Sequence, residues 1–149
     1  MEKEEEIRLL SRIGQILLHS APPGSREVEC TAAMVGDMGE MWTRAVVADG
    51  SEAHVSTPID LSSAFRELRS GMWAPGRGTW FSARYLLTPP SSFSVTYNFD
   101  REVEFSRPRP DSVDYYEDLL EHPRSPENTP VWLRERIEAA ARAIATPRE

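Results

Sequence analysis

The sequence has a single cysteine, Cys30, so no disulfide can form within the chain and no multi-cysteine zinc site is available. No stretch approaches the ~20 apolar residues that a membrane-spanning helix requires. The first ten residues, MEKEEEIRLL, are acidic and lack the apolar run of a secretory signal. These absences exclude a disulfide-stapled fold and a membrane helix, and they predict a cytoplasmic protein that does not associate with a membrane.

Positive charge is also scarce. The 149 residues include 17 Lys and Arg against 24 Asp and Glu, which gives a formal net charge of −7, and Lys3 is the only lysine. An acidic surface repels nucleic-acid phosphates, so we expect no direct binding to nucleic acid. The same surface favours association with a basic protein. The length suits one domain over residues 1–149.

Hydrophobic periodicity predicts a first helix over about residues 2–20. Gly14 in its middle is unfavourable in a helix, which suggests that a neighbour packs closely against it. The residues expected to form its buried face recur at a spacing of three to four, and they are Ile7, Leu10, Ile13, Leu17 and Leu18.

Alternating patterns and turn signals predict three strands over 26–35, 40–48 and 51–56, and two more over 80–87 and 93–99. Thr57-Pro58 and Thr129-Pro130 each predict a helix start with threonine as the N-cap. Residues 122–130 are a proline-rich loop before the last helix. The predicted order is α-βββ-α-ββ-α-α, an α+β domain with a mostly antiparallel sheet of about five strands and N-terminal, central and C-terminal helices.

Most of the excess negative charge lies late in the chain. Residues 100–121 contain eight acids and three arginines, a net charge of −5. A short helix is predicted over 111–121, with Val113, Tyr116 and Leu120 facing inward. The spacing places four acids on one helical face, which are Asp114, Glu117, Asp118 and Glu121.

This acidic stripe has two interpretations, a solvated helix face or a docking surface for a basic partner. Asp100 would extend a docking surface if the preceding loop folds beside the helix. Tyr115 lies next to the stripe and off the predicted apolar face, and an exposed tyrosine there would be a natural interface anchor.

The sequence offers no motif for catalysis. None of the three histidines has a second metal ligand at helical spacing, and no G-x-S-x-G elbow occurs. The glycines of Gly76-Arg77-Gly78 precede a strand, not a helix, so they indicate a turn and not a phosphate loop. We therefore expect no enzymatic activity, no cofactor and no metal site.

Several short motifs, spread in order over most of the chain, resemble the YezG-like immunity (antitoxin) family of bacterial polymorphic toxin systems. Residues 26–56 carry none of them, and residues 139–149 extend past the matching part. The motifs are Ile13-Gly14 with Leu17, Leu18 and Ala21-Pro22; Gly78-Thr79-Trp80; Phe93 through Tyr97-Asn98-Phe99-Asp100; and Pro123-Arg124 with Pro130 and Trp132.

The resemblance implies a non-catalytic protein, kept in the cytoplasm, that binds and neutralises a cognate toxin, including toxins that are nucleases. An acidic protein is suited to that role because a nuclease binds phosphates with a basic surface. Two alternatives stay open from the residues alone. One is a secretion chaperone or adaptor that binds a partner without inhibiting it, and the other is an enzyme whose cleft the sequence does not reveal.

Overall fold

The computed structural model describes residues 1–106 and 108–146 and confirms the predicted α+β class and element order. Within this part of the chain, no helix is long and apolar enough to cross a membrane. The elements are α1 (Lys3–Ser20), β1 (Glu27–Val35), β2 (Met38–Val46), β3 (Glu52–His54), α2 (Ile59–Gly71), β4 (Ser82–Thr88), β5 (Ser92–Asn98), α3 (Ser112–Glu121), a 3-10 helix η1 (Pro126–Asn128) and α4 (Val131–Ala145).

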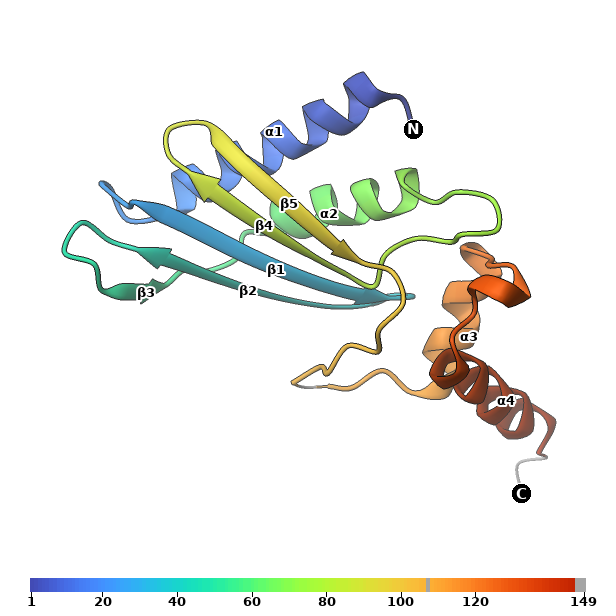
Figure 1. Ribbon diagram of the computed structural model, residues 1–149. Coiled ribbons are helices and arrows are strands. Elements are labelled where there is room, and N and C mark those ends of the chain that lie inside the picture. The colour runs from blue at the N-terminus through green and yellow to red at the C-terminus, as the bar shows by residue number, and fades with distance from the viewer. Residues whose placement is uncertain (107, 147–149) are drawn as a thin grey trace.

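The five strands form one antiparallel sheet in the order β3-β2-β1-β4-β5 (Figure 1). A tight turn joins β1 to β2, and Gly36 in it has a φ of +56°, which favours glycine. The chain then crosses through α2 so that β4 pairs with the free side of β1. β1 is therefore the central strand, and β5 forms one edge of the sheet.

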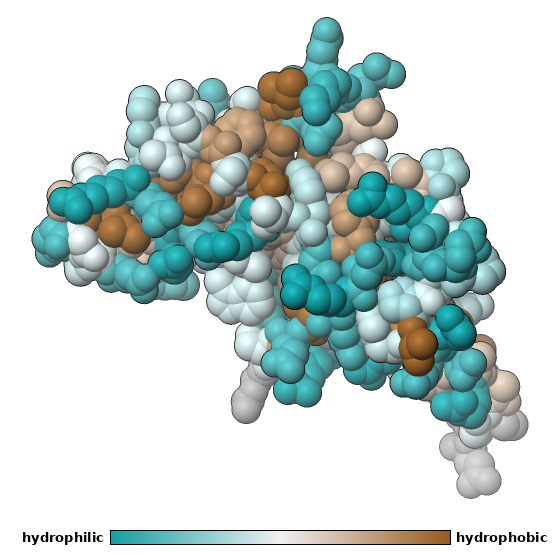
Figure 2. All heavy atoms as spheres, in the orientation of Figure 1, coloured by the Kyte–Doolittle hydropathy of each residue, from teal (hydrophilic) through white to brown (hydrophobic). Residues whose placement is uncertain are grey.

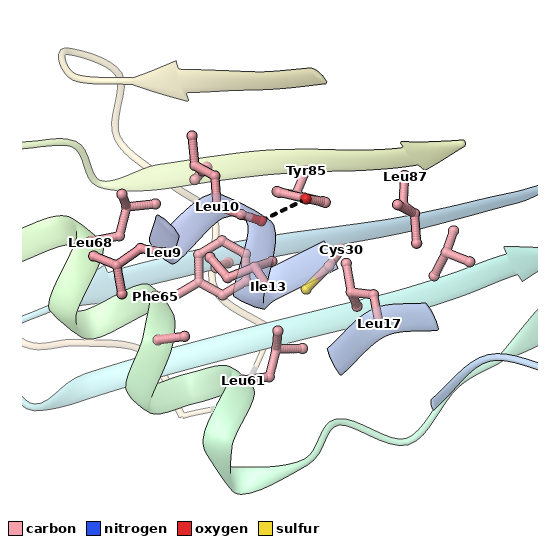
Figure 3. Packing of buried hydrophobic residues seen from close by; sticks show 14 of the residues in the cluster. Leu9, Leu10, Ile13, Leu17, Cys30, Leu61, Phe65, Leu68, Tyr85 and Leu87 are labelled. Carbon is pink, nitrogen blue, oxygen red and sulfur yellow. Dashed lines mark hydrogen bonds between the residues drawn. The ribbon is translucent and has the colours of Figure 1, made fainter. Parts of the chain in front are cut away.

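Helices α1 and α2 pack together and cover one face of the sheet (Figure 1). Alternate residues of β1 and β4 point into the core between the layers, among them Cys30 and Tyr85 (Figure 3). The largest buried side chains of α1 and α2 meet them there, and these are Leu9, Leu10, Ile13, Leu17, Leu61, Phe65 and Leu68.

The helix start signals are shifted by one residue from the prediction. Pro58 and Pro130 are themselves the N-caps of α2 and α4, and neither helix has a side-chain cap. The Thr129 hydroxyl instead donates to the carbonyl of Ser125, inside the proline-rich loop. The prediction for α1 is also partly wrong, because Leu9 is buried while Ile7 and Leu18 are 49% and 38% exposed.

Gly14 of α1 does have the close neighbour that its position suggested. The Tyr85 hydroxyl donates a 2.8 Å hydrogen bond to the carbonyl of Leu10, one turn before Gly14 (Figure 3). A Cβ on residue 14 would lie 2.6 Å from that hydroxyl oxygen. Glycine is therefore required here so that the tyrosine can reach the helix backbone.

Gly14→Ala is expected to lower the free energy of unfolding by about 1–3 kcal/mol, because overpacking outweighs the gain in helix propensity. Urea unfolding followed by circular dichroism measures the change. In a Tyr85→Phe background, which lacks the obstructing oxygen, the same substitution should cost clearly less. An equal cost in both backgrounds would contradict the close contact, and Ser11→Ala on the exposed side of α1 is the matched control.

The opposite face of the sheet is open over most of its area. On it, Glu29 accepts hydrogen bonds from Arg84 at 2.7 Å and Arg44 at 3.0 Å. The hydrogen bond from Arg84 lowers the pKa of Glu29, and its effect is larger than the opposing effect of burial. Helices α3 and α4 cover one end of the sheet, where a second hydrophobic cluster forms (Figure 1); its members are Ala33, Val35, Phe81, Phe105, Tyr115 and Leu133.

Candidate functional site

The predicted docking helix exists as α3, and its first turn is tied down by a reciprocal pair of hydrogen bonds. The Asp111 carboxylate accepts from the backbone N–H of Asp114 at 3.1 Å, and the Asp114 carboxylate accepts from the backbone N–H of Asp111 at 2.9 Å. This capping box satisfies two helix-end donors. Asp114 therefore stabilises the start of α3 as well as contributing negative charge to its surface.

The prediction that Asp118 shares an exposed face with the other acids is wrong. Its side chain is buried, with its residue only 2% exposed. Both carboxylate oxygens accept from the Arg69 guanidinium of α2, at 2.5 and 2.9 Å, and one also accepts from the Gly36 N–H at 2.9 Å. Asp118 thus joins α3 to α2 and to the β1–β2 turn.

The electrostatics of Asp118 follow from this burial. Burial opposes ionisation, but the hydrogen bonds and positive charge of Arg69, together with His122 and the Gly36 N–H, outweigh it, so the pKa of Asp118 lies well below its ordinary range. Arg69 also donates to the Trp80 carbonyl at 2.7 Å, and its residue is only 3% exposed. The two side chains therefore form an ionised, buried salt bridge between α2 and α3, and they lie 49 positions apart in the sequence.

A carboxyl group whose folded pKa lies below its unfolded value of about 3.9 stabilises the protein above that pH and loses this contribution as the pH falls. We therefore expect the stability difference between the wild type and Asp118→Asn to be larger at pH 5 than at pH 3. Urea unfolding at the two pH values measures it. Glu117→Gln on the exposed side of α3 is the control, and a difference independent of pH would contradict the ionised bridge.

The prediction that Tyr115 is an exposed interface anchor is also wrong. Its ring is buried in the second cluster, 6.3 Å from Phe81 and 5.7 Å from Trp132 between ring centroids. The Arg136 guanidinium lies 5.6 Å from its ring centroid. Burial raises the pKa of Tyr115. The tyrosine therefore holds α3 and α4 against the sheet.

The rest of the acidic stripe does face solvent. Glu117 and Glu121 are exposed, and Asp114 is half-buried. Leu120, predicted to face inward, is instead 66% exposed beside them. We call Asp114, Glu117, Leu120 and Glu121 the α3 acidic face. It presents two exposed carboxylates, Glu117 and Glu121, beside one exposed apolar side chain, with half-buried Asp114 about one turn before them.

Asp100 lies on a different part of the surface and belongs to a cluster around Arg124. The Asp100 carboxylate is exposed and lies 3.4 Å from the Arg124 guanidinium. That guanidinium donates to the carbonyls of Thr79 at 2.9 Å and Asn128 at 3.1 Å, and also to the carbonyl of Phe99. Arg124 thus joins the segments before β4 and after β5 to η1, and we call this set of contacts the Arg124 clasp.

Two tryptophans strengthen the same clasp. The indole N–H of Trp132 donates to the Asp100 carbonyl at 2.7 Å, and that of Trp73 donates to the Pro123 carbonyl at 2.9 Å. Gly78 has a φ of +80°, and a Cβ on it would lie 2.5 Å from the Arg124 side chain. Gly76 and Gly78 both have a positive φ in the turn that the sequence predicted, and Gly78 also leaves room for the Arg124 side chain.

The residues of the late motifs consequently meet in space. Arg124 contacts Thr79 and Asp100, and the Trp132 indole contacts Asp100, although these residues are far apart in the sequence. These contacts join separate segments of the fold. The sequence analysis did not single out Arg69 and named Arg124 only as part of a motif, because their partners lie 49 and up to 45 residues away.

A surface hollow of about 350 Å³ lies between residues 102–105 and 109–110 on one side and α3–α4 on the other. Its ion pair, Arg136 with Glu102 at 2.5 Å, is partly exposed. Over residues 1–106 and 108–146, no three His, Cys, Asp or Glu side chains gather closely enough to hold a metal ion. Buried His122 lies 3.7 Å from Asp118, next to the bridge to Arg69.

Comparison with models of known protein families gives no match, and no curated protein matches the sequence.

Proposed function

We propose that this protein is a non-catalytic, cytoplasmic immunity protein that binds and neutralises a cognate toxin through the α3 acidic face. The observation that carries the proposal is the pair of exposed carboxylates of Glu117 and Glu121 beside the exposed side chain of Leu120, with half-buried Asp114 about one turn earlier on α3. The ordered motifs that resemble the YezG-like family support the same role. A basic toxin surface, such as the phosphate-binding surface of a nuclease, is its electrostatic complement.

The composition of the α3 acidic face suits a protein partner. Carboxylates at the rim of an interface raise the association rate and select a partner of opposite charge. The exposed leucine supplies apolar area that a bare charged surface lacks. Asp100 lies outside this face, in the Arg124 clasp, and contributes to the negative field without being required for contact.

Co-expression tests the proposal. The product of the neighbouring gene is expected to arrest growth when expressed alone and to lose that effect when this protein is present. Purified together, the two are expected to form a stable complex in which the toxin's activity is blocked. A neighbour that is harmless alone, or that stays toxic beside this protein, contradicts the proposal. A complex that forms without inhibition favours an adaptor or chaperone instead.

Charge reversal at Glu117 and Glu121 tests the α3 acidic face itself. The double variant Glu117→Lys with Glu121→Lys is expected to lower the association rate constant for the toxin about tenfold or more at low ionic strength. The effect should fade as salt screens the charges. Stopped-flow or surface-binding kinetics at several salt concentrations measure it.

A matched control has the same change in net charge elsewhere. Glu52→Lys with Asp60→Lys alters two exposed acids on β3 and α2. If both double variants slow association equally, only the net charge matters and the α3 acidic face is not the docking surface.

A further inference from the structure

The outer edge of β5 is a strand edge without the usual protection. Over the residues that the structure describes, no strand pairs with it, because β5 ends the sheet order. Its seven residues, SFSVTYN, contain no charge and no proline, and their register with β4 is continuous from Thr88↔Ser92 to Ser82↔Asn98. Natural proteins commonly guard such edges with lysines, prolines or bulges. An unguarded edge is competent to pair with another strand.

The residues of β5 are chemically symmetric about Val95. Reading outward from it in both directions gives Ser94 and Thr96, then Phe93 and Tyr97, then Ser92 and Asn98. If a second copy paired with β5 in antiparallel register across a twofold axis at Val95, hydroxyl would face hydroxyl and aromatic ring would face aromatic ring. Such self-complementarity is what an interface between two identical subunits requires.

Helix α1 presents an apolar flank beside this edge. Leu18 and Phe93, each 38% exposed, line one hollow between α1 and the hairpin, and Ile7, 49% exposed, lies on the same flank of the helix. Figure 2 shows hydrophobic atoms gathered where α1 lies beside the β4–β5 hairpin. Ile7 and Leu18 do not belong to the core described above, and Phe93 stacks on Tyr85 at its margin, with 5.2 Å between the ring centroids.

The direction of α1 matches a twofold axis at Val95. Leu18 lies near Phe93, and Glu6 lines a hollow with Phe99, so α1 runs antiparallel to β5 with its middle near Val95. An axis there would place the first half of each α1 beside the second half of its mate. Ile7 of one copy would then approach Leu18 of the other.

Spacing and charge both permit this arrangement. α1 packs against β1 and β4, and the two β4 strands would lie three strand spacings apart, roughly 14 Å, so the two helices would be separated by at least about that distance. Helices in direct contact pack about 8–10 Å apart, so the two α1 helices would not collide and would face each other across a gap that only long side chains span. The acids of α1 all precede Ile7, whereas Arg8, Arg12 and His19 follow it, so each acidic end would face a basic half.

We propose that β5 is a homodimer interface, in which a second copy of this chain pairs antiparallel with it about Val95 to form a continuous ten-stranded sheet, with the two α1 flanks facing each other. The uncharged edge lets two acidic chains meet without repulsion at the axis. None of its residues belongs to the α3 acidic face. Dimerisation is therefore independent of the proposed function and leaves two toxin-binding faces available.

Sedimentation of the full-length protein over a wide range of concentration tests the proposal. The wild type is expected to reach twice the chain mass of 16.9 kDa. Ser94→Lys with Thr96→Lys changes two exposed positions on the open face of the sheet and would place like charges opposite each other twice across the axis. It is expected to weaken dimerisation about tenfold or more.

The matched variant Ser94→Lys with Thr96→Glu places opposite charges across the same axis and is expected to keep the dimer. The double lysine variant lowers the net negative charge of each chain, so its dissociation could not come from overall repulsion. Circular dichroism confirms that both variants fold. A wild type that stays monomeric, or a dimer that both variants leave unchanged, overturns the proposal. Loss of the dimer in both variants overturns the register about Val95.

Discussion

Asp118→Ala is expected to lower the free energy of unfolding by about 3–5 kcal/mol, because it leaves the Arg69 guanidinium buried without its counter-ion. Arg69 loses two hydrogen-bond acceptors, and the Gly36 N–H loses its only side-chain acceptor in the turn. A typical domain is stable by about 5–15 kcal/mol, so this is a large share of the total. Urea unfolding followed by tryptophan fluorescence measures the loss.

Two further variants separate the bridge from a general effect of charge. Glu117→Ala, one residue earlier and exposed, should change stability by less than about 0.5 kcal/mol. Replacing both partners, with Arg69→Met and Asp118→Leu, should recover much of the loss because no unpaired charge stays buried. If Asp118→Ala costs no more than Glu117→Ala, Asp118 is not the buried bridge and belongs with the surface acids after all.

Arg124→Ala is expected to cost about 2–4 kcal/mol, since three backbone carbonyls lose a charged donor and the Phe81 ring loses its cover. The Arg124 guanidinium lies 4.8 Å from the centroid of that ring. Arg124→Lys is expected to restore only part of the loss, because an ammonium group cannot reach several carbonyls with a planar fork. Urea unfolding and limited proteolysis of the 99–110 segment measure the effect.

The same substitution distinguishes a structural role from a docking role for the late motifs. If Arg124 and its neighbours act beneath the surface, the folded fraction of Arg124→Ala should bind the toxin as the wild type does. A variant that is as stable as the wild type but fails to bind would instead place the clasp in the interface. Titration calorimetry below the unfolding temperature gives this answer.

The element order followed from the sequence because period and turn chemistry are local. The alternation of β5 and the helical spacing of α2 required no knowledge of distant residues. The crossover that places β4 beside β1 depends on long-range packing, which periodicity does not encode. The helices start one residue later than predicted, with Pro58 and Pro130 as their N-caps. This small shift means that neither threonine caps its helix.

The acidic stripe shows why a helical face alone does not reveal its surroundings. Spacing placed Asp114, Asp118 and Glu121 together but did not say which side of the stripe turns inward. Tyr115 and Tyr116 are adjacent, and the prediction placed Tyr116 on the apolar face of the helix. The buried tyrosine is instead Tyr115. The deciding partner, Arg69, lies on another helix, so only the fold could reveal that Asp118 is structural.

The attachment of α3 has a consequence for the thermodynamics of association. Ordering a flexible segment on binding reduces affinity, and immobilising each rotamer-rich side chain costs about 0.5–1.5 kcal/mol. The backbone of α3 is already fixed, by the Asp118 bridge to α2 and the β1–β2 turn and by the capping box at its start. A partner that meets this helix loses entropy only in the side chains it touches, so more of the contact energy is retained as affinity.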